Sequence, residues 1–303
     1  MVSMGRVKQD LHNNCPWLYE YIYQFYQMTP YAKHKNARRI AELEDVSKKL
    51  RSRVEYESEI LKKYLNDDWT VRHGPFSGMK FVPVLPNSLL SPKVIGSYEN
   101  QIHQWIYDAI AHGYDRILDI GCAEGYYAVG FALKSRNSTV YAYDIDETSR
   151  GNTAALACLN GITERVRVRG LCTFDEFDRE VSNRTLIFCD IEGSEFDLLR
   201  PDLTSALSRA DLIVETHEDQ RPGVTETLVR RFLPSHRIEI VYHCAKYAAE
   251  FPVLKAVPAR EHALLLEEGR SPRQSWMRLL AKQPGAIEPV EWWPASEIPV
   301  GAR

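Results

Sequence analysis

The residues that most clearly suggest chemistry form the run Asp119-Ile-Gly-Cys-Ala-Glu-Gly125, at the end of a short apolar stretch. Glycine has no Cβ, so Gly121 and Gly125 would let a ligand approach the backbone closely. In sheets of parallel strands, ligands bind beyond the carboxyl ends of the strands. We therefore predict a cofactor site that includes Asp119, Gly121, Cys122, Ala123 and Gly125.

Two classes of cofactor compete for this motif. A dinucleotide pyrophosphate prefers Gly-x-Gly-x-x-Gly at a helix N-terminus, but Ala123 occupies the middle glycine position and Asp119 would bring negative charge near a phosphate. S-adenosylmethionine instead carries cationic amino and sulfonium groups, which a carboxylate favours. Asp144, 23 residues after Gly121 (144 − 121), would accept the ribose hydroxyls of either cofactor. The motif therefore favours a methyl donor over a nicotinamide cofactor, and a methyltransferase over an oxidoreductase.

A second group of candidate residues follows two later apolar runs. Asp190 follows residues 185–189, Glu215 ends residues 211–215, and His217 comes two residues later. These side chains, with Glu192, have three interpretations. They bind a divalent metal such as Mg²⁺, which would acidify a substrate hydroxyl; His217 is a general base oriented by Glu215 or Asp190; or the acids only bind substrate. Helix capping is the structural alternative. We favour a metal with Asp190, Glu215 and His217 as ligands and catalytic residues.

These candidates need a scaffold that brings them to one edge. Short apolar runs alternate with helical patterns, and the candidate strands are 116–120, 139–143, 166–169, 185–189, 211–215, 236–243 and 275–282. The rhythm predicts an α/β fold: a doubly wound, seven-stranded, mostly parallel sheet with helices on both faces and an antiparallel edge. We divide the chain into a helical N-terminal extension (1–65), a linker of turns and short strands (66–96), a catalytic domain (97–283) and an extended tail (284–303).

The motifs resemble those of a known family. Asp119-x-Gly121-x-x-x-Gly125 is similar to the signature of class I S-adenosylmethionine-dependent methyltransferases, and 189–195, Cys-Asp-Ile-Glu-Gly-Ser-Glu, resembles their FkbM-like branch. The resemblance spans roughly residues 96–282 and implies a Rossmann-like fold. It also implies that Tyr98 and Glu99 lie near the methionine end of the cofactor. The remaining residues that we assign to the cofactor site are Tyr126, Ile145, Cys172 and Asp190.

Composition sets the outer limits. The net charge of −3 shows no basic footprint for nucleic acid, and no stretch reaches the ~20 apolar residues of a membrane span. Residues 1–12 are polar, and the six cysteines match no zinc pattern, so we predict a reducing, cytoplasmic location without a secretory signal. Residues 16–65 combine an aromatic-rich start with a charged, helix-like segment, which predicts an arm that packs on the catalytic domain or forms a homo-oligomer.

The resulting functional hypothesis is O-methylation of a hydroxylated small molecule or carbohydrate, the substrate class that the FkbM resemblance implies. An N-methyltransferase of small molecules is the nearest alternative. A third is a catalytically inactive methyltransferase-like domain that acts as a binding module, which the intact Asp119, Gly121, Gly125 and Asp144 disfavour. Arg270, after a candidate helix at 261–268, is interpreted as a solvated side chain rather than a substrate ligand.

Overall fold

The computed structural model describes residues 53, 55–81, 90–271 and 273–282. The predicted tail and most of the N-terminal extension, including its aromatic start, therefore lie outside the described residues. The described strands are β1 (Arg116–Ile120), β2 (Thr139–Tyr143), β3 (Val166–Arg169), β4 (Thr185–Cys189), β5 (Asp211–Thr216), β6 (His236–Tyr242) and β7 (Ser275–Ala281). All seven coincide with the predicted runs to within one residue.

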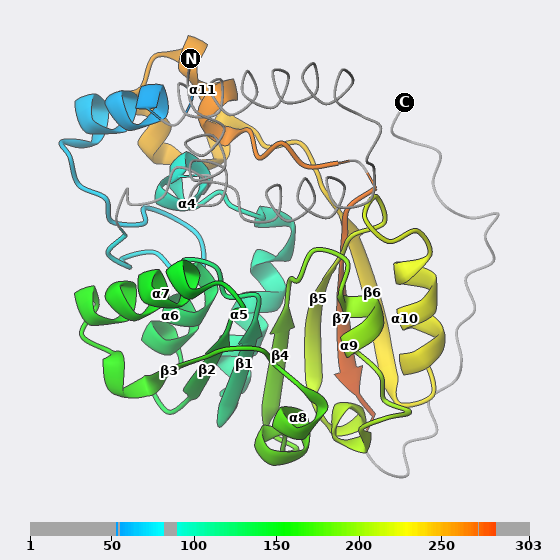
Figure 1. Cartoon of the computed structure of the whole chain (residues 1–303). Helices are drawn as coiled ribbons and strands as arrows, with labels where there is room; N and C mark the ends of the chain where they lie inside the picture. Colours follow the sequence, from blue (N-terminus) through cyan, green and yellow to red (C-terminus); the bar gives the residue numbers. More distant parts are fainter. Residues whose placement is uncertain (1–52, 54, 82–89, 272, 283–303) are drawn as a thin grey trace, which may run out of the picture.

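The strands form one sheet in the order β3-β2-β1-β4-β5-β7-β6 (Figure 1). Strands β1 to β5 pair in parallel, whereas β7 is antiparallel to both β5 and β6. The prediction of a mostly parallel sheet with an antiparallel edge is confirmed. Because the parallel strands all end at one rim, the residues that follow β1, β2, β4 and β5 are brought to the same side of the molecule.

Helices cover both faces of the sheet, as predicted. On one face pack α5 (His103–His112), α6 (Tyr126–Lys134) and α7 (Glu147–Leu159), and on the other α8 (Phe174–Glu180), α9 (Glu195–Leu198) and α10 (Val224–Phe232). Neighbouring strand residues alternate between the two cores: Ile117 belongs to one cluster and Leu118 to the other. A strand buried on both faces needs a continuous apolar run, which explains why β1 and β4 were so clear in the sequence.

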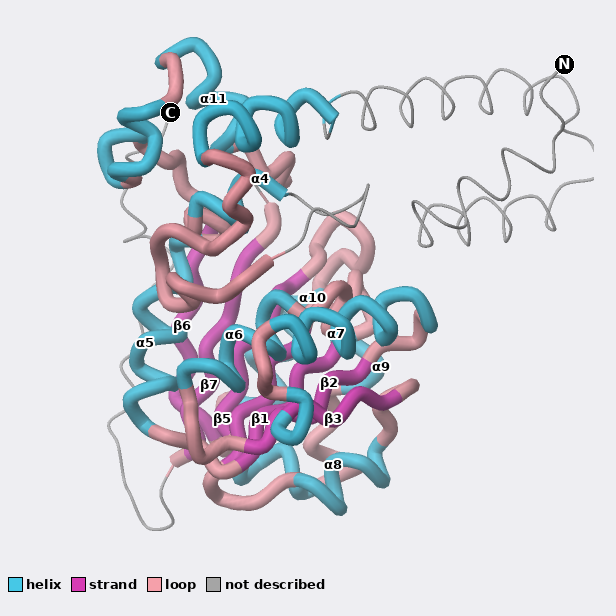
Figure 2. The backbone as a smooth tube through the Cα atoms, turned by 90° about the vertical axis from the view of Figure 1, so that its left-hand side faces the viewer, coloured by secondary structure: helices cyan, strands magenta, loops and turns pink. Residues whose placement is uncertain are grey.

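A third layer, which we call the cap, lies over the carboxyl ends of the strands (Figures 1 and 2). It combines the helical residues 55–65 and α4 (Leu90–Ile95) with residues 246–271, which contain α11 (Ala259–Leu266). Segments distant in sequence are joined there, since Tyr56 donates to Glu261 over 3.0 Å and Ser91 to Glu57 over 2.8 Å. The helix α4 was not predicted, because the segment was interpreted as turns and short strands.

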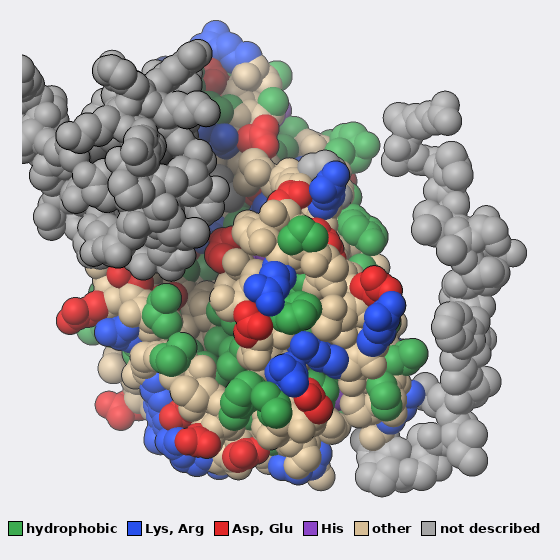
Figure 3. All heavy atoms as spheres, turned by 45° about the vertical axis from the view of Figure 1, so that its right-hand side comes forward, with side chains coloured by type: hydrophobic (Ala, Val, Ile, Leu, Met, Phe, Trp, Pro, Cys, Tyr) green, Lys and Arg blue, Asp and Glu red, His purple; other side chains and the backbone are tan. Residues whose placement is uncertain are grey.

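The short 3-10 helices are η1 (Asn100–Ile102), η2 (Thr163–Arg165), η3 (Ser205–Arg209), η4 (Ala248–Glu250) and η5 (Pro252–Ala256). Over α10 and β6, acidic and basic side chains are interspersed on the visible face (Figure 3). Exposed pairs such as Arg230 with Glu226 contribute to this pattern. Among the described residues, no helix is both long and apolar enough to span a membrane.

Two glycines with open space around them test how backbone conformation decides the effect of an added methyl group. Gly151 lies inside α7, whereas Gly113 caps α5 with a φ of +72°, and nothing lies within 4 Å of a Cβ at either position. We expect Gly151→Ala to raise the free energy of unfolding by about 0.5–1 kcal/mol. Gly113→Ala should lower it by about 1–2 kcal/mol, because L residues are strained at positive φ. Urea denaturation measures both, and equal signs would contradict the assignment.

Candidate functional site

The turn after β1 is built around the close approach of two strand ends. Gly121 has a φ of +86°, and a Cβ on it would overlap the carbonyl oxygen of Asp190. Its N–H and that of Cys122 both donate to the carbonyl oxygen of Tyr143, over 2.8 and 3.0 Å. Glycine is therefore required at position 121 by the protein itself, in addition to any requirement of a ligand.

The rest of this turn uses two further left-handed residues. Ala123 adopts a φ of +46° without being glycine, and Gly125 adopts +92° at the N-cap of α6. The Ala123 N–H donates to Asp144 Oδ2 over 2.9 Å, and the Gly125 N–H donates to the Cys122 carbonyl over 2.8 Å. The N–H groups of residues 121, 122, 123 and 125 are thus all bonded within the protein. A pyrophosphate would find few free amides here, which disfavours a dinucleotide.

Asp119 lies at the centre of this turn with unmet hydrogen-bonding capacity. It is buried, and its Oδ2 has no hydrogen-bond partner among the described residues. Burial, together with the nearby Asp190, raises its pKa well above the usual range. A buried carboxylate without a partner is costly, and a cationic group placed beside it would remove that cost. The site therefore fits an ammonium or sulfonium group.

The structure separates the other predicted cofactor residues into two groups. Asp144 follows β2 and is half-buried, and Ile145 beside it has a side chain that is 78% exposed. Leu171, which follows β3 and was not predicted, is 68% exposed. In contrast, Cys172 and Tyr126 are buried, and the Tyr126 ring packs edge-on against Phe76. The first group is available to a ligand, whereas the second supports the core.

His217 is the centre of the second predicted group. Its Nδ1 lies 2.9 Å from Glu195 Oε1, while its Nε2 faces Asp190 Oδ1 at 3.5 Å and Glu192 Oε2 at 3.4 Å. Although burial alone would lower the pKa of His217, the hydrogen bond to Glu195 and the charge of Asp190 raise it to about 9. Without a metal, the imidazole is therefore protonated at neutral pH and poorly suited to act as a base.

Three atoms in this group are buried without a hydrogen-bond partner among the described residues: Asp190 Oδ1, Glu215 Oε2 and His217 Nε2. Potential ligand atoms of Asp190, Glu192 and His217 lie within 4.8 Å of one another. Glu192 is held over His217 by a left-handed backbone (φ +54°) and by Gln220, whose Nε2 donates to its Oε2 over 3.2 Å. The clustering of donors fits a divalent cation.

This geometry changes the predicted ligand set. Glu215 is at the strand end where it was predicted, and its Oε2 lies 3.7 Å from His217 Nε2. However, its Oε1 accepts from Arg270 Nη1 over 2.9 Å, and Glu215 is not part of the compact group of three. Glu192, which was noted in the sequence but not selected as a ligand, takes that place. The preceding strand does not reveal this, because Glu192 reaches His217 through an unusual turn.

Arg270 is not the solvated side chain that was expected. Only 12% of its side chain is exposed, and its guanidinium bonds Glu99, Glu215 and the Tyr98 hydroxyl. The interpretation failed because Arg270 follows α11 in the cap, and the cap folds back over the sheet. Glu99, predicted near the cofactor, is fully buried and also accepts from the Tyr127 hydroxyl. Since both of its oxygens are engaged, Glu99 holds Arg270 and Tyr127 in place.

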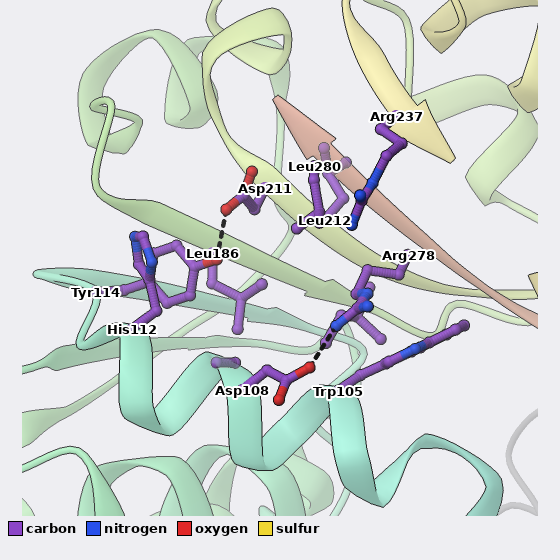
Figure 4. Close-up of a pocket in the computed structure, with 12 residues that line it drawn as sticks. Trp105, Asp108, His112, Tyr114, Leu186, Asp211, Leu212, Arg237, Arg278 and Leu280 are labelled. Carbon is purple, nitrogen blue, oxygen red and sulfur yellow. Dashed lines mark hydrogen bonds and ion pairs between the residues drawn. The ribbon is translucent and has the colours of Figure 1, made fainter. Parts of the chain in front are cut away.

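A separate cavity of about 260 Å³ lies at the other end of the sheet (Figure 4). Trp105 and Asp108 of α5 and Arg278 of β7 line it, and Arg278 pairs with Asp108 at 2.7 Å. None of the predicted site residues lines this cavity, and no polar side-chain atom around it is both buried and unpartnered. The chemistry is therefore concentrated at the carboxyl ends of the strands.

Comparison with known proteins leaves the function to be argued from these residues. No protein-family profile and no curated protein matches the chain. Among solved structures, a putative O-methyltransferase from Klebsiella pneumoniae is similar at 12% identity and a TM-score of 0.43, covering 60% of this chain and 80% of that one. The O-methyltransferase TomG from Streptomyces achromogenes, solved with S-adenosylmethionine, is similar at 10% identity and a TM-score of 0.44, with 76% and 90% covered.

Proposed function

We propose that this protein is an S-adenosylmethionine-dependent methyltransferase. The observation that carries the proposal is the buried, unpartnered Asp119 Oδ2 beside a turn whose amides are already bonded within the protein. Such a site favours a cationic ligand over a phosphate. Asp144 is available for the ribose, and the exposed Ile145 and Leu171 offer apolar surface beside it for a base. The FkbM-like motif at 189–195 supports placing the chain in that branch.

We propose O-methylation of a hydroxylated small molecule or sugar as the reaction, assisted by a divalent metal such as Mg²⁺. Asp190, Glu192 and His217 would hold the metal, which when bound lowers the pKa of a substrate hydroxyl and orients it. Glu195 holds His217 Nδ1, so Nε2 is directed toward the two carboxylates. The protein itself aligns donor and acceptor, since methyl transfer is an in-line displacement at carbon.

Two alternatives remain distinct from this proposal. N-methylation of a small amine would use the acidic rim to bind a cationic substrate, without a requirement for metal. A binding module without activity would retain the cofactor site but transfer no methyl group. Product analysis with hydroxylated and amino acceptors, with and without Mg²⁺, separates the three possibilities.

The proposal is tested by calorimetric titration with S-adenosylhomocysteine and with NAD. We expect the former to bind and the latter not to bind. Asp144→Ala should weaken binding of S-adenosylhomocysteine by about 1.5–3 kcal/mol, through loss of hydrogen bonds to a charged acceptor. Asp146→Asn is the matched control, because Asn retains the N-cap that Asp146 supplies to Ser149. Tight NAD binding, with no response to S-adenosylhomocysteine, would refute the proposal.

A further inference from the structure

Lys93 is a buried cation for which neither the fold nor the proposed reaction accounts. It lies on α4 in the cap, and only 6% of the residue is exposed. Burying an ammonium group is costly unless it is paired and its N–H groups are used. Its position on a short helix of the cap therefore calls for a specific reason.

The surroundings of Lys93 belong to the candidate cofactor site. Its Nζ forms an ion pair with Glu124, a residue of the turn between Asp119 and Gly125. The same Nζ lies 4.6 Å from the ring centre of Tyr98 and 5.7 Å from that of Tyr126. An ammonium has three N–H donors, and Glu124 is its one hydrogen-bond acceptor among the described residues. Donor capacity is left over beside the turn.

The ligand proposed above supplies a complementary group. The methionine end of S-adenosylmethionine carries an ammonium and a carboxylate. Asp119 Oδ2 is suited to the ammonium, but the N–H groups of residues 121, 122, 123 and 125 are already bonded and cannot hold the carboxylate. A side-chain cation is then required, and Lys93 is adjacent to the turn through Glu124.

We propose that Lys93 binds the α-carboxylate of the methyl donor and makes the site selective for a donor that retains this group. The inference rests on the proposed function. Lys93 would also connect the cap to the ligand, because α4 packs against α11 and the ammonium extends from α4 to the turn. Residues from the cap and the sheet would thus bind opposite charges of the same zwitterion.

The test compares three ligands that differ in the methionine moiety: S-adenosylmethionine, its decarboxylated form, and 5′-methylthioadenosine, which lacks the whole amino-acid portion. Calorimetry gives each dissociation constant for the wild type and Lys93→Met. We expect the wild type to prefer S-adenosylmethionine over the decarboxylated form by about 10- to 100-fold, the usual range for a charged hydrogen bond. Lys93→Met should lose most of this preference, whereas its affinity for methylthioadenosine should change less than about threefold.

Two further variants separate ligand binding from support of the turn. Glu124→Gln removes the ion pair but leaves the ammonium, so it should retain the preference for the carboxylate. Lys134→Met, an exposed lysine on α6, is the matched control and should behave as the wild type. If Lys93→Met does not fold, the Glu124→Gln and Lys93→Arg proteins still decide, since both should retain the preference.

Several results would overturn the inference. Equal weakening of all three ligands by Lys93→Met, or loss of the preference in Glu124→Gln, would show that Lys93 only supports the turn. A wild type without any preference would also exclude the contact. Failure of all three adenosine ligands to bind the wild type would instead refute the proposed function, which keeps the two conclusions distinguishable.

Discussion

Excess chelator abolishes methyl transfer by this protein while leaving the binding of S-adenosylhomocysteine nearly unchanged: this is the result we expect first. The reason is the separation of the two groups of residues. Asp119 and Asp144 follow β1 and β2, whereas Asp190, Glu192 and His217 follow β4 and β5. Loss of the metal would remove substrate activation without altering the residues proposed to hold the donor.

The variants that accompany this experiment test which carboxylate is the ligand. Asp190→Asn and Glu192→Gln should both lose Mn²⁺ binding and the metal response of activity. Glu215→Gln should retain Mn²⁺ binding, because the nearest ligand group excludes Glu215 and Arg270 engages its Oε1. Glu195→Gln should weaken Mn²⁺ by about 10- to 100-fold, since Glu195 only orients His217. Asp219→Asn, an exposed acid in the next loop, serves as the control.

Full activity in excess chelator would exclude the metal proposal. In that case the pH–rate profile becomes decisive. A metal-free base at His217 requires the neutral imidazole, whose pKa is raised to about 9, so the rate would rise toward that pH rather than near 6.5. A rate that is independent of pH over this range would leave substrate binding as the role of the acidic residues.

The second large effect concerns Arg270. We expect Arg270→Met to lower the free energy of unfolding by about 3–5 kcal/mol, because it leaves Glu99 and Glu215 as buried carboxylates without their cation. Burial already raises the pKa of both acids, which indicates how unfavourable their charged forms are there. Urea denaturation followed by circular dichroism measures the change.

Two controls make this result specific. Arg230→Met removes an exposed helical ion pair with Glu226, and should cost only about 0.3–0.5 kcal/mol. Glu215→Gln should reduce the penalty of Arg270→Met by about 1–3 kcal/mol, because one of the stranded charges is then absent. An Arg270→Met protein as stable as the wild type would show that the guanidinium does not balance these acids.

The sequence by itself determined the sheet and the location of the cofactor turn. Strands buried on both faces require continuous apolar runs, and these delimited β1 and β4 to the residue. Gly121 was also identified correctly as a position without room for a side chain. The close neighbour, however, is the Asp190 carbonyl from β4, and local spacing contains no information about that pairing.

Only the tertiary structure decided how the charged residues are partnered. Glu192 rather than Glu215 joins Asp190 and His217, since a left-handed turn redirects the first and Arg270 engages the second. Arg270 and Lys93 are buried because the cap folds over the sheet from both sides in sequence. Hydrophobic periodicity reports which face of an element is buried, whereas the partner of a charge depends on contacts between residues far apart in the chain.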